Sequence, residues 1–184
     1  MKYMSINLYE PPEFAVWGTF NDRVVSRGWV DKLQGLYENF IDSTAEESTI
    51  EVVLDPKWLT NEKEMVEKPE MLEIGDIPEM KFDPQYMEEI KKKEVWMMGG
   101  NHRRIALKEF LDEKTRQLEK LRNEWDELRR GQQREVEGPQ EREARAASMK
   151  EKSEEIAALE MRISKSTHWC VKVYSRGTLD SGEL

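Results

Sequence analysis

The chain of 184 residues contains one cysteine, Cys170, and two histidines, His102 and His168. A single thiol excludes an intrachain disulfide, which favours a reducing compartment. Three such side chains are also too few for a metal centre built from cysteine and histidine ligands. We therefore expect an intracellular protein, cytoplasmic or nuclear, that has no metal site of its own.

The sequence also lacks long apolar runs. No stretch approaches the ~20 residues that cross a bilayer, and the first residues lack the apolar segment of a secretory signal, so we expect no membrane association. Charged residues make up 36% of the chain, and the formal net charge is -9. This charge gives little general attraction for nucleic acid. So polar a composition also predicts that part of the chain is an exposed helical element.

Five segments have the composition or the alternation of β-strands. Residues 2–9 alternate in polarity, which predicts a half-buried strand. Residues 49–54 are rich in β-branched side chains. Residues 167–174 are expected to return to the main sheet beside an earlier strand. The full set comprises 2–9, 15–20, 49–54, 95–98 and 167–174.

Two shorter segments are predicted to be helical. Residues 24–40 carry apolar side chains at mostly helical spacing, which predicts an amphipathic helix with its aromatic residues, Trp29 among them, in the core. Residues 85–93 follow Asp83-Pro84, a pair that suits the start of a helix because proline needs no hydrogen-bond partner there.

A heptad pattern runs through the second half of the chain. Two runs of apolar residues recur every seven positions: Leu111, Leu118 and Trp125, then Met149, Ile156 and Ile163. Glycine and proline interrupt the pattern at 131–139. Two matched runs predict an antiparallel helical hairpin inserted at about 111–163. One solvated helix followed by a disordered tail is the alternative, and the order of 131–142 is left open.

The most informative stretch is 94–107. A short apolar run ends at Gly99-Gly100 and continues into residues that suit a helix. Backbone amides at a helix N-terminus lack partners inside the helix, and the helix dipole adds positive charge there. Glycines let this backbone approach a ligand, so the segment predicts a seat for a phosphate group. An ordinary strand-to-helix turn is the alternative.

Residues 99–103, Gly-Gly-Asn-His-Arg, resemble the Gly-Gly-Cys-His-Arg signature of sulfiredoxins. Residues 100–103 also fall on the Gly-Glu-Arg-Arg phosphate-binding box of the chromosome-partitioning protein ParB, and Ala106 falls on the alanine that closes that box. The specific match is confined to this motif, while the order of the expected elements is compatible over a larger part of the chain.

The resemblance points to the ParB/sulfiredoxin-like superfamily. It implies an α+β fold with a small mixed β-sheet and flanking helices, in a single domain over 1–184 that carries the hairpin as an insertion. It also implies a nucleotide or other phosphate ligand, with a nucleoside triphosphate and Mg²⁺ as the cofactor. The implied ligand-binding residues are Gly99, Gly100, Asn101, His102 and Arg103, and no catalytic residue is assigned.

Asn101 departs from both family patterns. Sulfiredoxins have their nucleophilic cysteine at this position, and an amide cannot replace a thiolate, so the chain is not expected to reduce sulfinic acids by that route. ParB has a glutamate there, and a neutral amide oxygen is a weaker ligand for Mg²⁺. This puts metal-assisted hydrolysis in doubt, whereas phosphate binding by backbone amides and arginine is retained.

The other motif side chains each have an ordinary structural alternative. Arg103 is expected to contact phosphate directly, because its guanidinium is always charged and pairs with oxyanions at two points. His102 could bind phosphate, shuttle a proton or simply begin the helix. Arg104 falls on a variable position of the box, so we expect it to be solvated or salt-bridged.

Three features outside the motif are weaker candidates. Lys91–Lys93 is interpreted as a solvated helix face, although it could add positive potential near a phosphate. Asp55 follows a strand and could act as a base or metal partner, but Asp-Pro pairs are usually turns. Cys170 lies within a strand pattern, where a buried cysteine behaves as a small apolar residue.

Three functions are compatible with these observations. The first is a phosphohydrolase or phosphotransferase, whose substrate the fold alone does not choose. The second is a non-catalytic interaction or scaffold protein that pairs with a partner, or with a second copy, through its coiled-coil-like hairpin. The third is DNA binding as in ParB, against which the net charge and the acidic residues of the heptad region argue.

Overall fold

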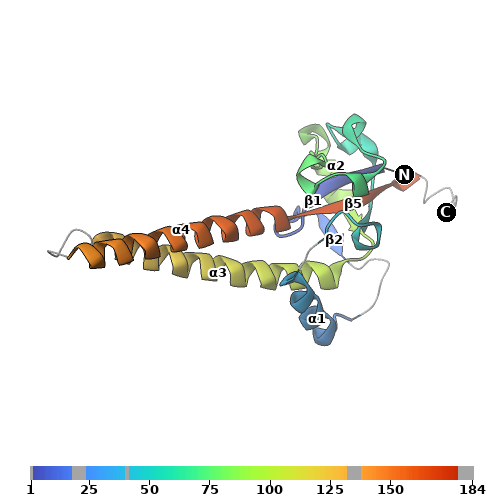
Figure 1. Ribbon diagram of the computed structural model, residues 1–184. Coiled ribbons are helices and arrows are strands. Elements are labelled where there is room, and N and C mark those ends of the chain that lie inside the picture. The colour runs from blue at the N-terminus through green and yellow to red at the C-terminus, as the bar shows by residue number, and fades with distance from the viewer. Residues whose placement is uncertain (1, 18–23, 40–41, 132–137, 178–184) are drawn as a thin grey trace. The chain divides into compact units, whose positions relative to one another are not determined.

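The computed structural model describes residues 2–17, 24–39, 42–131 and 138–177 (Figure 1). The chain divides into two compact units. Unit 1 comprises Met1–Glu109 together with Ser166–Leu184, and unit 2 comprises Phe110–Lys165. Among the described residues, no helix combines the length and the apolar character needed to cross a membrane.

Unit 1 is built on a five-stranded mixed sheet with the strand order β1-β5-β3-β4-β2. The pairs β1/β5 and β3/β4 are antiparallel, while β3/β5 and β2/β4 are parallel. The predicted small mixed sheet is therefore confirmed, and the last strand returns to it between two earlier ones. The strands are β1 Lys2–Asn7, β2 Ala15–Trp17, β3 Ile50–Leu54, β4 Val95–Met97 and β5 His168–Ser175.

Strand β1 differs from the half-buried strand that its alternation predicts. Tyr3 and Ser5, which should face solvent, are 6% and 1% exposed. Tyr3 exchanges backbone hydrogen bonds with Val66, and its side chain packs in a cluster with Ile77 and Cys170. The irregular segment after β3 therefore covers this strand, a tertiary contact that alternation alone cannot reveal.

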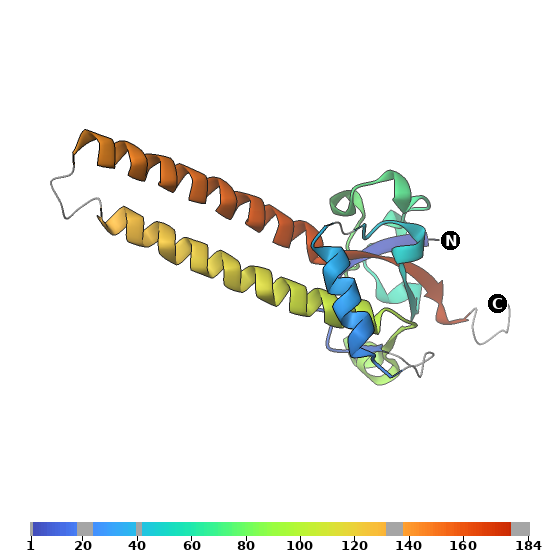
Figure 2. The ribbon, with the colours of Figure 1, turned by 60° about the horizontal axis from the view of Figure 1, so that its bottom comes forward.

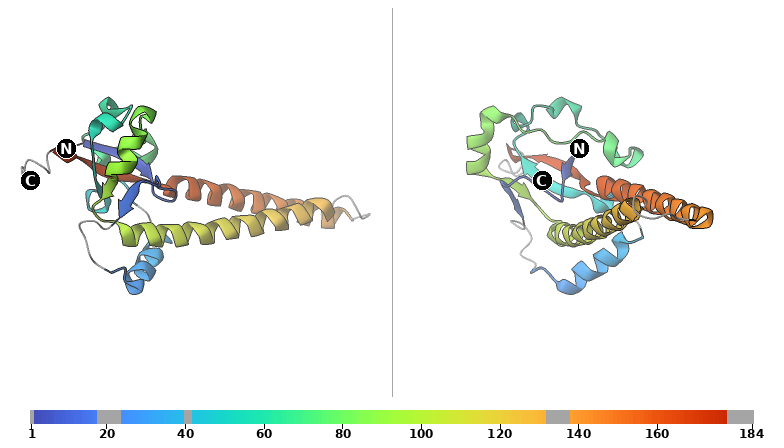
Figure 3. Two further views of the ribbon diagram at one scale, coloured as in Figure 1. Left: turned by 180° about the vertical axis from the view of Figure 1, so that it is seen from behind. Right: turned by 90° about the vertical axis from the view of Figure 1, so that its left-hand side faces the viewer.

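Helices α1 (Arg27–Tyr37) and α2 (Met87–Lys93) lie on opposite sides of the sheet (Figures 1 and 3). The predicted start before α2 is confirmed, because an Asp83 carboxylate oxygen accepts a hydrogen bond from the Gln85 amide at 2.9 Å. Just after that cap, Pro84–Tyr86 forms a 3₁₀ turn that leads into α2.

The expectation that the aromatic residues of the first helix lie in the core is wrong for Trp29. Trp29 is 59% exposed, whereas Val30 and Tyr37 are buried. The helix therefore has apolar residues on two faces, and the sequence does not say which of them faces the sheet. Phe40 lies outside the described residues.

Unit 2 contains the later part of α3 (Asn101–Gly131) and most of α4 (Pro139–Ser166). The two helices run antiparallel and side by side in every view (Figures 1, 2 and 3). Ion pairs join them: Arg122 with Glu160 at 2.6 Å, and Lys152 with Glu124. The long helical pair predicted from the heptads is confirmed. The connecting residues 132–137 lie outside the described part of the chain.

Candidate functional site

The motif lies where β4 ends and α3 begins. Gly100 has φ +78°, a left-handed conformation that favours glycine. A Cβ atom added there would lie 2.8 Å from the Cδ1 and Cγ1 atoms of Ile50 on β3. Ala106 and Leu107, one turn further along α3, are fully buried. The start of the helix is therefore held tightly against the sheet, as the strand–glycine–helix interpretation predicts.

The first turn of α3 leaves backbone amides without acceptors inside the helix. The amide of Arg104 donates to the Gly100 carbonyl at 2.8 Å, which is the first bond of the helix. The amides of the three preceding residues, 101–103, thus have no acceptor inside the helix, and Gly100 has no side chain with which to cap them. The first turn contains no acidic residue, and residues 102–104 are His-Arg-Arg. Cations at this end of a helix are unfavourable unless an anion offsets them.

His102 connects the motif to α1. Its Nε2 atom accepts a hydrogen bond from the Ser26 amide at 2.9 Å, just before α1 begins. A neutral imidazole that accepts through Nε2 carries its hydrogen on Nδ1, so the second nitrogen has a hydrogen to donate. His102 thus has a structural role through one of its two ring nitrogens.

Arg103 is engaged by the turn that precedes β3. Its Nη1 atom donates to the carbonyls of Ser48 and Thr49 at 3.1 and 3.4 Å, and Nη2 donates to the Glu47 carbonyl at 2.7 Å. These bonds fasten the 3₁₀ turn Glu46–Ser48 to α3. A direct contact between Arg103 and phosphate stays a prediction, and it would compete with these carbonyls.

Arg104 is partly buried and not fully solvated, contrary to expectation. Its guanidinium lies 5.1 Å from the centroid of Trp17 and donates to the Asn101 side-chain oxygen at 3.2 Å. Among the described residues no carboxylate pairs with it. Burial lowers the pKa of Arg104 below its ordinary value. The sequence does not show this, because Trp17 lies far from Arg104 along the chain.

A hollow of about 700 Å³ opens beside the start of α3. It brings together three of the five predicted ligand residues, Gly100, His102 and Arg103, whereas Gly99 and Asn101 do not line it. The remaining lining comes from α1 and the residues before it, and it includes Trp29, which the sequence predicts to lie in the core. The lining residues are Val24, Ser26, Trp29, Leu33, Gly100, His102 and Arg103.

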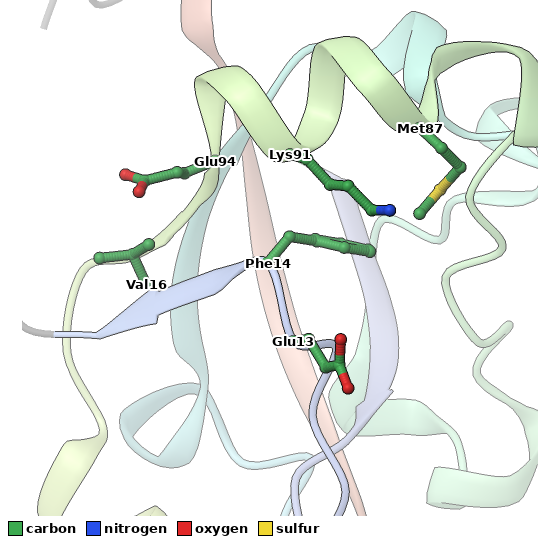
Figure 4. Close-up of a pocket in the computed structure, with 6 residues that line it drawn as sticks. All are labelled: Glu13, Phe14, Val16, Met87, Lys91 and Glu94. Carbon is green, nitrogen blue, oxygen red and sulfur yellow. The ribbon is translucent and has the colours of Figure 1, made fainter.

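A second hollow of about 530 Å³ lies between β2 and α2 (Figure 4). Its lining includes Lys91, whose side chain extends past the Phe14 ring towards Met87, while Glu13 lies on the other side of that ring. Among the described residues that line it, two carry carboxylates and one, Lys91, is basic. This mixed lining suits a phosphate less well than the hollow at α3.

The weaker sequence candidates have structural roles. Asp55 accepts a hydrogen bond from the Lys57 amide at 3.2 Å and pairs with the Lys57 ammonium, as a turn residue does. Lys93 pairs with Glu89 along α2. Cys170 is fully buried, and this burial raises the pKa of its thiol to about 12. Among the described residues, no group of three or more histidine, cysteine, aspartate or glutamate side chains is placed to hold a metal ion.

Comparison with models of known protein families, with curated proteins and with solved structures found no match to this chain.

Proposed function

We propose that the chain binds a nucleotide or another phosphate ligand at the start of α3, in an arrangement like the phosphate-binding box of the ParB/sulfiredoxin-like superfamily. The phosphate group contacts the amides of residues 101–103 and the Nδ1 hydrogen of His102. Arg103 and Arg104 supply positive charge around it. In a triphosphate complex, Mg²⁺ is held mainly by phosphate oxygens and water, as this ion prefers.

The observation that carries this proposal is the composition of the first turn. The first turn has amides without acceptors inside the helix, a glycine in the capping position and His-Arg-Arg instead of acidic residues. This combination is electrostatically unfavourable by itself. Local departures from the usual rules of stability are expected at functional sites. A bound phosphate group would satisfy the amides and offset the charge at the same time.

The reaction, if one follows binding, is a phosphoryl transfer to water or to a second substrate. Asn101 supplies no nucleophile, so a covalent sulfur or phosphate intermediate at this position is excluded. Phosphate release from the tightest-binding nucleotide, measured over hours with the purified chain, decides between a phosphohydrolase and a binding protein.

Calorimetry with ATP, CTP, GTP and ADP in the presence of Mg²⁺ tests the proposal. Arg103→Ala is a poor probe, because it also removes the bonds that fasten the turn before β3. Asn101→Asp is sharper: it changes one atom, keeps an acceptor for Arg104, and puts a negative charge at the helix start. We expect it to stabilise the fold by about 0.5 kcal/mol and, in titrations without Mg²⁺, to weaken phosphate binding by about 1 kcal/mol or more. With Mg²⁺ present the new carboxylate can also ligate the metal, so the comparison of the two chains is made without it.

Asn39→Asp is the matched control. Asn39 follows α1 and does not line the hollow, so the same added charge should leave binding nearly unchanged. Absence of binding by the native chain to all four nucleotides would contradict the proposal. Binding without Mg²⁺ that Asn101→Asp does not weaken would place the ligand elsewhere.

A second candidate function is a scaffold that acts through unit 2. The observation in its favour is that the heptad side chains Trp125, Leu128 and Ile156 are only partly buried in the helical pair. Such a seam can accept a further helix from another protein or from a second copy.

A further inference from the structure

The hollow at α3 has two chemically different walls. One wall consists of Gly100, His102 and Arg103 at the start of α3, where the proposed phosphate lies. The other is apolar and includes Trp29 and Leu33 of α1. A free phosphate ion needs only the first wall.

Trp29 contributes little to the core of the fold. It is 59% exposed, although tryptophan normally buries most of its large apolar surface. The packing of α1 on unit 1 is supplied by Val30 and Tyr37, which are 1% and 5% exposed. Together with Val24 and Leu33, Trp29 gives the hollow an apolar lining, which is typical of sites for small molecules.

The size of the hollow agrees with a ligand larger than phosphate. Sites for small molecules commonly enclose about 300–1,000 Å³, and this hollow has about 700 Å³. The Lys32 ammonium lies over one face of the Trp29 ring, 4.9 Å from its centroid, so a ligand ring has the other face on which to stack.

We propose that the ligand is a phosphate ester whose other half is a flat aromatic ring, and that this ring stacks against Trp29 while the phosphate occupies the start of α3. The inference rests on the proposed phosphate site and adds the recognition of the ring. Both an aryl group and a nucleobase have this chemistry. The described lining can stack on the ring and make apolar contacts with it. It contains no amide or carboxylate side chain that could form hydrogen bonds with the edge of a nucleobase.

Calorimetry with inorganic phosphate, phenyl phosphate, 1-naphthyl phosphate and AMP tests the inference. Stacking on an aromatic side chain is typically strong enough to change affinity by about tenfold or more. We therefore expect both aryl esters and AMP to bind at least about tenfold more tightly than inorganic phosphate. If 1-naphthyl phosphate binds as tightly as AMP, any aromatic ring is sufficient for the gain in affinity. If AMP binds more tightly, the site prefers a nucleoside.

Trp29→Ala should remove this gain and leave the affinity for inorganic phosphate unchanged. Leu36→Ala is the control, because Leu36 lies on the same helix, is also 59% exposed and does not line the hollow. Both variants remove an exposed side chain, so their melting temperatures should stay close to that of the native chain, which confirms that they fold.

Three results would overturn the inference. Equal affinity for inorganic phosphate and all esters would show that the ring makes no favourable contact, while the proposed phosphate site would still stand. A gain that survives Trp29→Ala would place the ring elsewhere. Failure of phosphate and esters alike to bind would overturn the phosphate seat as well.

Discussion

Gly100 is the residue on which the geometry of the site depends most directly. Its left-handed φ of +78° directs the chain from β4 into α3, and its missing side chain leaves room for Ile50 of β3. Both features belong to the backbone, so no side-chain substitution elsewhere can replace them. The glycine pair was the clearest sequence signal of the site, although the sequence does not say which of the two glycines is obligatory.

Gly100→Ala should destabilise the protein by about 1–3 kcal/mol, because alanine is strained at this φ and its Cβ atom would collide with Ile50. Urea unfolding followed by circular dichroism measures the change. Gly99→Ala is the matched control: no atom lies within 4 Å of the Cβ position there, so the effect should be small. Equal destabilisation by both substitutions would contradict the assignment of the obligatory glycine to position 100.

The contacts of Arg103 and Arg104 could not be predicted from the sequence. Arg103 was expected to be the main phosphate contact, yet its guanidinium donates to three backbone carbonyls of the turn before β3. Arg104 was expected to be solvated, yet it lies partly buried over Trp17. Which arginine faces which neighbour depends on long-range packing, and the residue types alone carry no information about that packing.

At the scale of elements, local sequence patterns predict where strands and helices form, but they do not predict which face of each element is buried. β3 and the caps before α2 follow from β-branched composition and from Asp-Pro chemistry, which act within a few residues. The orientation of α1 and the burial of β1 depend on segments distant in sequence. Trp29 was therefore missed as a site residue. Its spacing from Leu33 and Leu36, four and seven positions on, marks an apolar stripe separate from the buried face.

The end of α2 offers a test of strain at an element boundary. Glu94 has φ 63° and ψ 155°, a combination that is essentially confined to glycine. Arg176 holds this end by donating to the carbonyls of Lys93 and Glu94 at 2.7 and 3.0 Å. It also stacks on Trp96, with 4.1 Å from the guanidinium carbon to the ring centroid.

Glu94→Gly should raise the free energy of unfolding by about 1 kcal/mol, because glycine adopts this conformation without strain and that relief exceeds its entropic cost. Guanidinium chloride unfolding measures the difference. Glu94→Ala removes the same carboxylate but keeps the strain, so its stability should stay close to that of the native chain. A gain from alanine as large as that from glycine would assign the effect to the charge of Glu94 and not to its backbone.

For the whole molecule, the division into two units separates the two candidate functions. Unit 1 holds the motif and the hollow at α3, and unit 2 holds the helical pair. Of the net charge of -9, unit 2 contributes -1 by sequence, so like-charge repulsion there opposes self-association only weakly. The heptads predicted this helical pair, because an apolar period of seven directly reflects the packing of one helix on another.

The apolar stripes of unit 2 either pack against each other within one hairpin or pack against another chain. The first arrangement predicts a monomer, and the second predicts an assembly. Its helices are joined by the Arg122–Glu160 pair, and Leu118 is 7% exposed, which indicates that the stripes are used internally. We therefore expect sedimentation equilibrium to give the monomer mass of 21.8 kDa at every concentration from micromolar to near millimolar. Ile156→Glu, on the partly buried seam, should then lower stability without changing the mass.

A mass of the native chain that rises with concentration would instead favour the scaffold function. If Ile156→Glu returned this mass to the monomer value, the seam would be the surface that joins two copies.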